Sequence, residues 1–131
     1  MRQTTAKSAK AAADRACREL VRLRGACQRC LGTRDLQWAH IRRRHYVGDP
    51  DGTSLRTNPE NSWLLCPECH RTVDTDQVAF VALVEQTIGL ELYEEFVRLS
   101  HANHRPWRKA DWLRERDHLR GLLEAAGKAR A

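Results

Sequence analysis

Two cysteine pairs with identical spacing stand on either side of the segment that runs from residue 31 to residue 65. The pairs are Cys27 with Cys30 and Cys66 with Cys69. Two thiolates separated by two residues can bind one tetrahedral ion, and two such pairs complete a four-sulfur site. Zn²⁺ is the ion that this ligand set favours. The spacing therefore predicts a structural zinc site that closes a small fold without a large core.

Side chains of a second chemical type lie between and just after the cysteine pairs. They are His40, His45, Asn61 and His70, and Asp74 follows four residues after His70. Imidazoles can transfer protons and hold divalent ions, and carboxylates suit Mg²⁺ or Mn²⁺. If a helix begins at the second cysteine pair, His70 and Asp74 share one of its faces. One stretch of chain thus joins metal-ligand spacing to candidate catalytic histidines.

The helices and strands that must position these residues are short between the two cysteine pairs and long outside them. Residues 36–38 and 63–65 are the best strand candidates, turn-forming residues occupy 48–52 and 58–61, and a helix is expected after Cys69. Apolar residues at helical spacing predict a helix over 8–24, two more around 80–88 and 92–99, and a last one over about 111–126. The last helix has its apolar residues Trp112, Leu119, Leu122 and Leu123 along one stripe.

These patterns predict an α+β protein in three parts. A basic helix occupies residues 1–26, a small core held together by the four-cysteine zinc site occupies 27–76, and a helical extension packed on the core occupies 77–131. Cys17 belongs to neither pair and falls on the inner face of the first helix, so we expect it to be structural.

The charge and hydropathy of the chain indicate which classes of binding partner to expect. The chain has 131 residues, a formal charge of +6 and a pI near 9.4, which favours a polyanionic partner. No stretch approaches the roughly 18 apolar residues of a membrane helix, and residues 1–10 lack the apolar centre of a secretory signal. We therefore expect a cytoplasmic protein that does not enter membranes. In the reducing cytoplasm, paired cysteines bind metal rather than form disulfides.

The order of these residues resembles the zinc-containing branch of the HNH endonucleases. That pattern runs from a Cys-x2-Cys pair to a short strand ending in His-Ile, then to Asn, then to Leu-Cys-x2-Cys-His. It is present here over residues 27 to about 74, with His40-Ile41, Asn61 and Leu65 followed by the second cysteine pair and His70. The flanking helices look more narrowly like phage or prophage HNH proteins of the recombination type.

The resemblance implies a ββα-metal finger that hydrolyses DNA phosphodiester bonds in a bacterial or phage-infected cell. It implies that His40 is the general base that activates water, that Asn61 braces the loop or contributes to the metal site, and that His70 ligates a catalytic Mg²⁺, Mn²⁺ or other divalent ion. The family often has a metal-binding histidine where Asp74 stands here. Phosphodiester hydrolysis requires a base that deprotonates the nucleophile. It also requires a cation that stabilises the negative charge developing on the phosphate and the leaving oxygen.

One position departs from the family pattern. The residue before the base is often an Asp or His metal ligand, and here it is Ala39, which cannot coordinate an ion. Either the ion keeps extra waters, or His45 or another residue fills the gap, or the ion binds weakly. A further alternative makes His40 the ligand and His45 the base.

The basic run that follows the proposed base predicts contacts with the nucleic-acid backbone. It consists of Arg42, Arg43, Arg44 and His45, and Arg56 is a weaker candidate of the same kind. The leading prediction is thus a metal-dependent DNA endonuclease. The alternatives are a zinc-stabilised nucleic-acid-binding module without cleavage, and a role of the C-terminal helices as a homodimer or partner surface.

Overall fold

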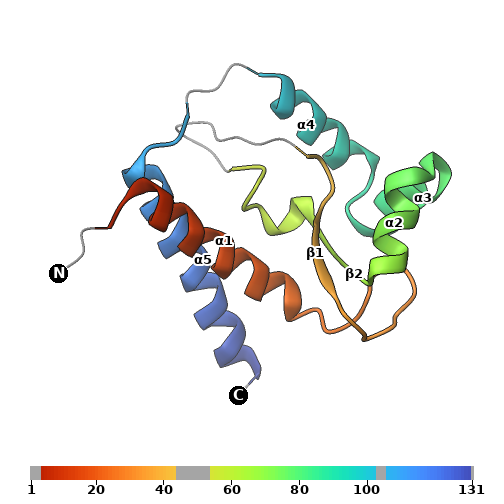
Figure 1. Cartoon of the computed structure of the whole chain (residues 1–131), viewed down its shortest axis with the longest axis horizontal. Coiled ribbons are helices and arrows are strands. Elements are labelled where there is room, and N and C mark those ends of the chain that lie inside the picture. Colours follow the sequence, from red (N-terminus) through yellow and green to blue (C-terminus); the bar gives the residue numbers. More distant parts are fainter. Residues whose placement is uncertain (1–3, 44–53, 103–105, 131) are drawn as a thin grey trace.

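The structure is a computed structural model that describes residues 4–43, 54–102 and 106–130. Within these residues it is an α+β fold with five α-helices and one two-stranded antiparallel sheet (Figure 1). The elements are α1 (Ala6–Arg22), β1 (Gln37–His40), a short 3-10 helix (Pro59–Asn61), β2 (Ser62–Leu65), α2 (Pro67–Thr75), α3 (Gln77–Thr87), α4 (Leu90–His101) and α5 (Lys109–Arg130). The expected α+β class and the order of helices and strands are therefore confirmed.

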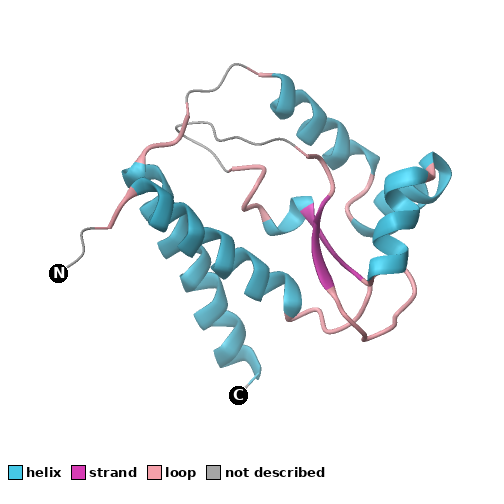
Figure 2. Ribbon diagram, in the orientation of Figure 1, coloured by secondary structure: helices cyan, strands magenta, loops and turns pink. Residues whose placement is uncertain are grey.

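The sheet consists of the two strands that the sequence places beside the cysteine pairs. β1 and β2 run antiparallel, with Ala39 opposite Trp63 and His40 opposite Ser62 (Figure 2). One residue, Cys66, separates β2 from α2; it caps the helix, and Pro67 occupies the first helical position. Two strands and a helix thus bring the ends of the 31–65 segment together.

A separate apolar cluster lies on each face of this sheet. One cluster contains Ala39, Trp63 and Leu65 with side chains from α2 and α3, such as Val73 and Val84. Neighbouring residues of a strand point to opposite faces, so Leu64 faces the second cluster. The sheet is therefore covered by α2 and α3 on one side and by α1 and α5 on the other.

The second cluster joins the two ends of the chain. Small residues of α1 are buried there, namely Ala9, Ala13 and Ala16, together with Trp112 and Leu119 of α5. Because alanine side chains are short, the two helices can pack closely, and Figure 1 shows them side by side. Cys17 is buried in this cluster, and burial raises the pKa of its thiol to about 12.

Helix boundaries differ from the sequence-based expectation by a few residues. α1 begins at Ala6 because Thr5 and Ser8 form a capping box, and α5 begins at Lys109 rather than near residue 111. Along the apolar stripe expected for α5, Trp112 and Leu119 are buried, whereas Leu122 is 41% exposed. No helix of the described segments is long and apolar enough to cross a membrane.

Candidate functional site

The four cysteines of the two pairs converge on one point. The Sγ atoms of Cys27, Cys30, Cys66 and Cys69 all lie within 4.8 Å of one another. A tetrahedral zinc site with Zn–S bonds of about 2.3 Å has sulfur–sulfur edges of about 3.8 Å. The Sγ atoms of Cys30 and Cys66 are 3.8 Å apart. The cysteines are thus positioned to bind a metal ion.

Both cysteine turns hold their sulfurs with backbone N–H groups. Cys30 N lies 3.5 Å from Cys27 Sγ, and Cys69 N lies 3.4 Å from Cys66 Sγ. Burial raises the pKa of Cys27, but such backbone donors outweigh burial and lower it to about 6. Burial and the neighbouring sulfurs raise the pKa of Cys69 to about 12. Four thiolates this close repel one another, so a divalent cation would favour the fully deprotonated set.

Asn61 connects the end of β1 to the loop before β2. Its Oδ1 accepts from the Arg42 backbone N–H at 2.8 Å, and its Nδ2 donates to the carbonyls of Arg42 at 3.1 Å and Leu55 at 2.8 Å. The side chain is fully buried. Asn61 therefore braces the backbone beside His40, which is one of the two roles that the family resemblance implies.

His40 is held by a backbone carbonyl and an aromatic ring. Its Nε2 lies 2.8 Å from the Arg56 carbonyl oxygen, and its ring centroid lies 4.6 Å from that of Trp38. A carbonyl only accepts, so Nε2 carries the hydrogen and Nδ1 of the neutral ring has a free lone pair. Burial lowers the pKa of His40, and the Arg56 charge lowers it further, against the opposing effect of the carbonyl. The ring is thus neutral and able to accept a proton near neutral pH.

His70 and Asp74 lie together on one face of α2, as their spacing predicts. His70 Nε2 and Asp74 Oδ2 are 3.7 Å apart. His70 Nδ1 lies 2.8 Å from Gln37 Oε1, and an amide oxygen only accepts. The hydrogen of His70 is therefore on Nδ1, and the Nε2 lone pair faces Asp74. This is the arrangement in which a hydrogen bond from one ring nitrogen orients the other as a metal ligand.

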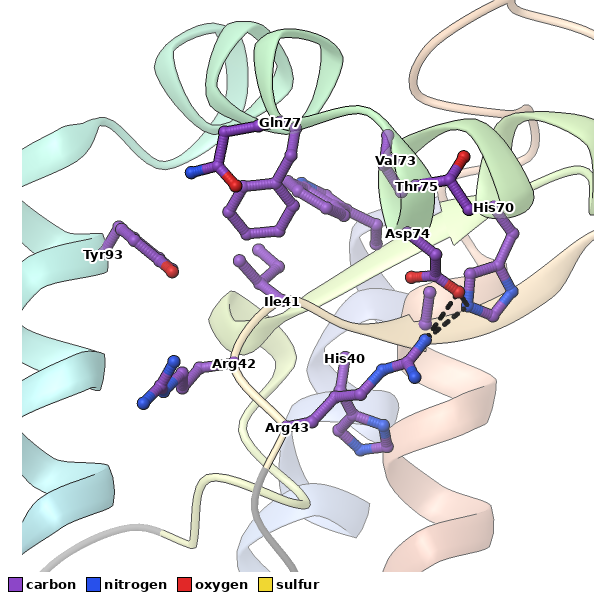
Figure 3. Close-up of a pocket in the computed structure, with 13 residues that line it drawn as sticks. His40, Ile41, Arg42, Arg43, His70, Val73, Asp74, Thr75, Gln77 and Tyr93 are labelled. Atoms are coloured by element: carbon purple, nitrogen blue, oxygen red, sulfur yellow. Dashed lines mark hydrogen bonds and ion pairs between the residues drawn. The ribbon is translucent and has the colours of Figure 1, made fainter.

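Arg43 contacts both members of this pair. Its Nη2 donates to Asp74 Oδ2 at 2.7 Å and lies 3.5 Å from His70 Nε2 (Figure 3). The Arg43 guanidinium group therefore occupies the position that a cation bound by His70 and Asp74 would take. His40 points away from the pair in Figure 3.

One cavity of about 440 Å³ lies between the end of β1 and the helices α2, α3 and α4. His40 and Arg43 of the strand end, His70 and Asp74 of α2, and Tyr93 of α4 border it. The structure thus brings His70 and Asp74 together and places His40 at the border of the same cavity. Asn61 is not among the lining residues and braces the backbone just after His40.

Ala39 separates the two faces of this site. It is buried in the cluster beside α2, whereas His40, the next residue of the strand, lies against Trp38 on the opposite face. The strand geometry therefore places His40 away from the α2 pair, which disfavours the alternative that His40 is a ligand of the same ion as His70. His45, the other residue of that alternative, lies outside the described residues.

The predicted backbone-binding residues have partners within the chain. Arg42 Nε donates to Ser100 Oγ of α4 at 2.9 Å, and Arg56 forms an ion pair with Asp14 of α1. Arg56 is therefore a structural residue rather than a phosphate ligand in this conformation. Arg44 and His45 lie outside the described residues.

Three residues of this region do not emerge from sequence reasoning. Gln37 orients His70, Asp14 binds Arg56, and Glu115 of α5 accepts from the Thr57 hydroxyl at 2.8 Å. Gln37 has a detectable signal, because it stands within the strand that carries His40. No sequence signal identifies Asp14 or Glu115, because the residues around them do not indicate that α1 and α5 contact the loop at residues 54–57.

Comparison of the chain with protein-family models, with curated proteins and with solved structures gave no match. The function is therefore inferred from the residues and geometry of this site.

Proposed function

We propose that the protein is a metal-dependent endonuclease of the HNH type that hydrolyses phosphodiester bonds of DNA. The observation that carries the proposal is the shared cavity, which is lined by a half-buried neutral histidine, His40, and by the potential ligand pair His70 and Asp74. The four-cysteine site, with zinc as its ion, holds together the small core that carries these residues. The cavity provides the place where a phosphodiester meets both groups.

His40 has the features of a general base for this reaction. Its Nε2–H is engaged by Arg56, so Nδ1 is the atom that takes a proton from water. Trp38 lies against the ring and reduces its access to solvent, which keeps the imidazole neutral. The neutral form is the one that can accept a proton at physiological pH.

His70 and Asp74 are the residues that would hold the catalytic ion. One imidazole nitrogen and one carboxylate are a donor set that suits Mg²⁺, Mn²⁺ and several other divalent ions. When bound, such an ion stabilises the negative charge that develops on the phosphate and the leaving oxygen. Ala39 supplies no third ligand, so the protein contributes few bonds to the ion and its binding is expected to be weak.

DNA is the proposed substrate because the chain is basic and its cavity is bordered by cationic side chains. The formal charge is +6, and Arg42 and Arg43, two and three residues after His40, line the same cavity. Guanidinium groups can hold phosphate oxygens through two parallel hydrogen bonds. Arg43 is able to serve this purpose only if it leaves Asp74.

The test is nicking of supercoiled and branched DNA by the zinc-bound protein with Mg²⁺, Mn²⁺ or Ni²⁺. His40→Ala is expected to abolish nicking while zinc content and thermal stability are retained, since the imidazole ring makes one hydrogen bond and one ring contact with the residues that the structure describes. His118→Ala is the matched control, because His118 is an exposed histidine of α5 outside this cavity. Equal nicking by the His40→Ala variant would remove His40 as the base.

The second candidate is a zinc-stabilised nucleic-acid-binding module without cleavage. The observation in its favour is Arg43, whose charge already neutralises the Asp74 carboxylate, together with the absence of a donor at Ala39. Salt-sensitive DNA binding without products, across all three metals, would favour this candidate.

A further inference from the structure

Residues 54–57 connect His40 to α1 and α5, two of the helices that lie outside the core of residues 27–76. The Arg56 carbonyl accepts from His40, and the Arg56 side chain binds Asp14 of α1. The next residue, Thr57, donates its hydroxyl to Glu115 of α5. One short piece of chain is thus tied to His40, to α1 and to α5.

The contact between Arg56 and Asp14 fixes orientation as well as distance. Arg56 Nε lies 2.8 Å from Asp14 Oδ1, and Arg56 Nη2 lies 3.0 Å from Asp14 Oδ2. Two parallel hydrogen bonds of this kind restrain the guanidinium plane more tightly than one bond does. The side chains are only 33% and 18% exposed, so solvent competes weakly for them. The backbone of Arg56 is therefore held in one place relative to α1.

Glu115 restrains the same segment from the other side. It is a buried carboxyl group, 7% exposed, and Thr57 is 1% exposed. Burial raises the pKa of Glu115, and the hydrogen bond from Thr57 opposes this rise. A buried polar group is costly to the fold unless it is paired, so this contact has a strong reason to persist.

The two helices form one support. α1 and α5 share the cluster that contains Ala13, Cys17, Trp112 and Leu119, and they lie side by side in Figure 1. Asp14 follows a buried alanine of α1, while Glu115 lies between the two buried apolar residues of α5. The packing of one helix on the other thus sets the position of both carboxylates.

We propose that Asp14 and Glu115 are positioning residues for His40. Together they fix the Arg56 carbonyl, and that carbonyl selects the form of the imidazole with its hydrogen on Nε2. Nδ1 is then the atom that accepts a proton. The catalytic consequence rests on the proposed function, whereas the effect on the His40 ring does not.

The experiment uses the full-length zinc-bound protein and measures the His40 ring by nitrogen NMR. The wild type should show the Nε2–H form. Asp14→Asn and Glu115→Ala should each raise the share of the Nδ1–H form several-fold, because the carbonyl is no longer held. Glu115→Gln should keep the wild-type signal, since its amide oxygen can accept from Thr57. Asp117→Asn is the matched control, because it removes an exposed ion pair of α5 with Arg116.

Nicking provides the second readout. Asp14→Asn and Glu115→Ala should lower kcat about ten-fold or more with KM unchanged, since a displaced base slows proton transfer without weakening DNA binding. Zinc content and thermal stability identify any unfolded variant. If Glu115→Ala does not fold, Arg56→Lys replaces it, because lysine keeps the charge and loses the paired hydrogen bonds.

The outcomes separate the two proposals. If the folded variants Asp14→Asn and Arg56→Lys keep the wild-type ring signal, the positioning role is wrong, whatever the nicking shows. If the ring signal shifts but the wild type never nicks DNA, the positioning role stands and the proposed function fails.

Discussion

The Arg43 guanidinium group donates to the Asp74 carboxylate at 2.7 Å. The same nitrogen lies near the Nε2 atom of His70, so a divalent ion bound by the pair must displace Arg43. Arg43→Ala should therefore bind Mn²⁺ several-fold more tightly than the wild type. Titration of the zinc-bound protein with Mn²⁺, followed by electron paramagnetic resonance, measures this affinity.

The control for this variant must remove an equal charge near His70 without touching Asp74. Arg71→Ala does so, because Arg71 is exposed and adjacent to His70 in the chain. It should change Mn²⁺ affinity less than Arg43→Ala does, and Asp74→Asn should weaken binding. Equal or weaker Mn²⁺ binding by Arg43→Ala would show that Arg43 does not compete with the ion.

Gln37 should tune the same site through His70. Its side-chain oxygen holds the hydrogen of His70 on Nδ1 and so directs the Nε2 lone pair toward Asp74. Removal of such an outer partner typically costs about 10–100-fold in metal affinity. Gln37→Ala should lose affinity for Mn²⁺ or Ni²⁺ on that scale, whereas Gln37→Glu should retain it. Gln77→Ala, which changes an exposed glutamine that lines the cavity, should leave affinity near the wild-type value.

Asn61→Ala should destabilise the protein more than a change of the nearby Asn58. Asn61 makes three hydrogen bonds to backbone groups in a buried position, and its loss leaves those groups unpaired. We expect a loss of about 2–4 kcal/mol in the free energy of unfolding, since each buried unsatisfied group costs about 1–3 kcal/mol and the changes are not additive. Chemical denaturation of the zinc-bound protein measures it.

Asn58 provides the comparison for this measurement. Its side chain accepts one hydrogen bond, from Glu60 N at 2.9 Å, at the start of the 3-10 helix. Asn58→Ala should cost only about 1 kcal/mol, as for loss of a single cap. If both variants lose the same stability, Asn61 is not the brace that its contacts indicate.

The sequence predicts the parts of this molecule that local chemistry determines. The cysteine spacing predicts the sulfur cluster, and the interval between His70 and Asp74 predicts their shared helix face, because both depend on the geometry of a single turn. Helix periodicity likewise predicts α1 and α5 as separate helices.

What the sequence could not predict are the contacts that join distant segments. Asp14 and Arg56 are far apart in the chain, and nothing in either neighbourhood specifies the other. The exposure of Leu122 is a related case, since the stripe of α5 is set by how much of the helix α1 covers. Arg43 is a third, because a basic residue after the proposed base is equally compatible with phosphate and with Asp74.

Removal of the metal from the cysteine site should unfold the core around it. Structural zinc contributes about 10–16 kcal/mol in small domains, which matches or exceeds the total stability of a typical protein. Chelation, or replacement of Cys66 by Ser, should abolish the cooperative thermal transition, and the wild type should contain one zinc per chain. Cys17→Ala should retain both the transition and the zinc, because Cys17 lies in the other cluster. A transition unaffected by chelation would exclude a structural metal.

Nicking should fall in acid as His40 is protonated. Burial lowers the pKa of His40, and the charges of Arg56 and Arg43 act in the same direction while Asp14 opposes them. The pH profile of kcat/KM reports the pKa of the base in the free enzyme. The apparent pKa of its acid side should therefore lie below the ordinary histidine value of about 6.5. An apparent pKa at or above that value would indicate that another group, or an exposed His40, controls the reaction.

The same shift has a consequence for folding that can be measured without DNA. The unfolded chain binds a proton at His40 at a higher pH than the folded chain does, so the unfolded state is favoured as the pH falls. The contribution of neutral His40 to stability is full above about pH 6.5 and is lost as the pH falls through the lower, folded-state pKa. His40→Gln should remove this part of the pH dependence, whereas His118→Gln should keep it. Denaturation curves at several pH values between 4 and 8 would reveal the difference, and identical pH profiles for the wild type and His40→Gln would contradict a lowered pKa for the half-buried imidazole.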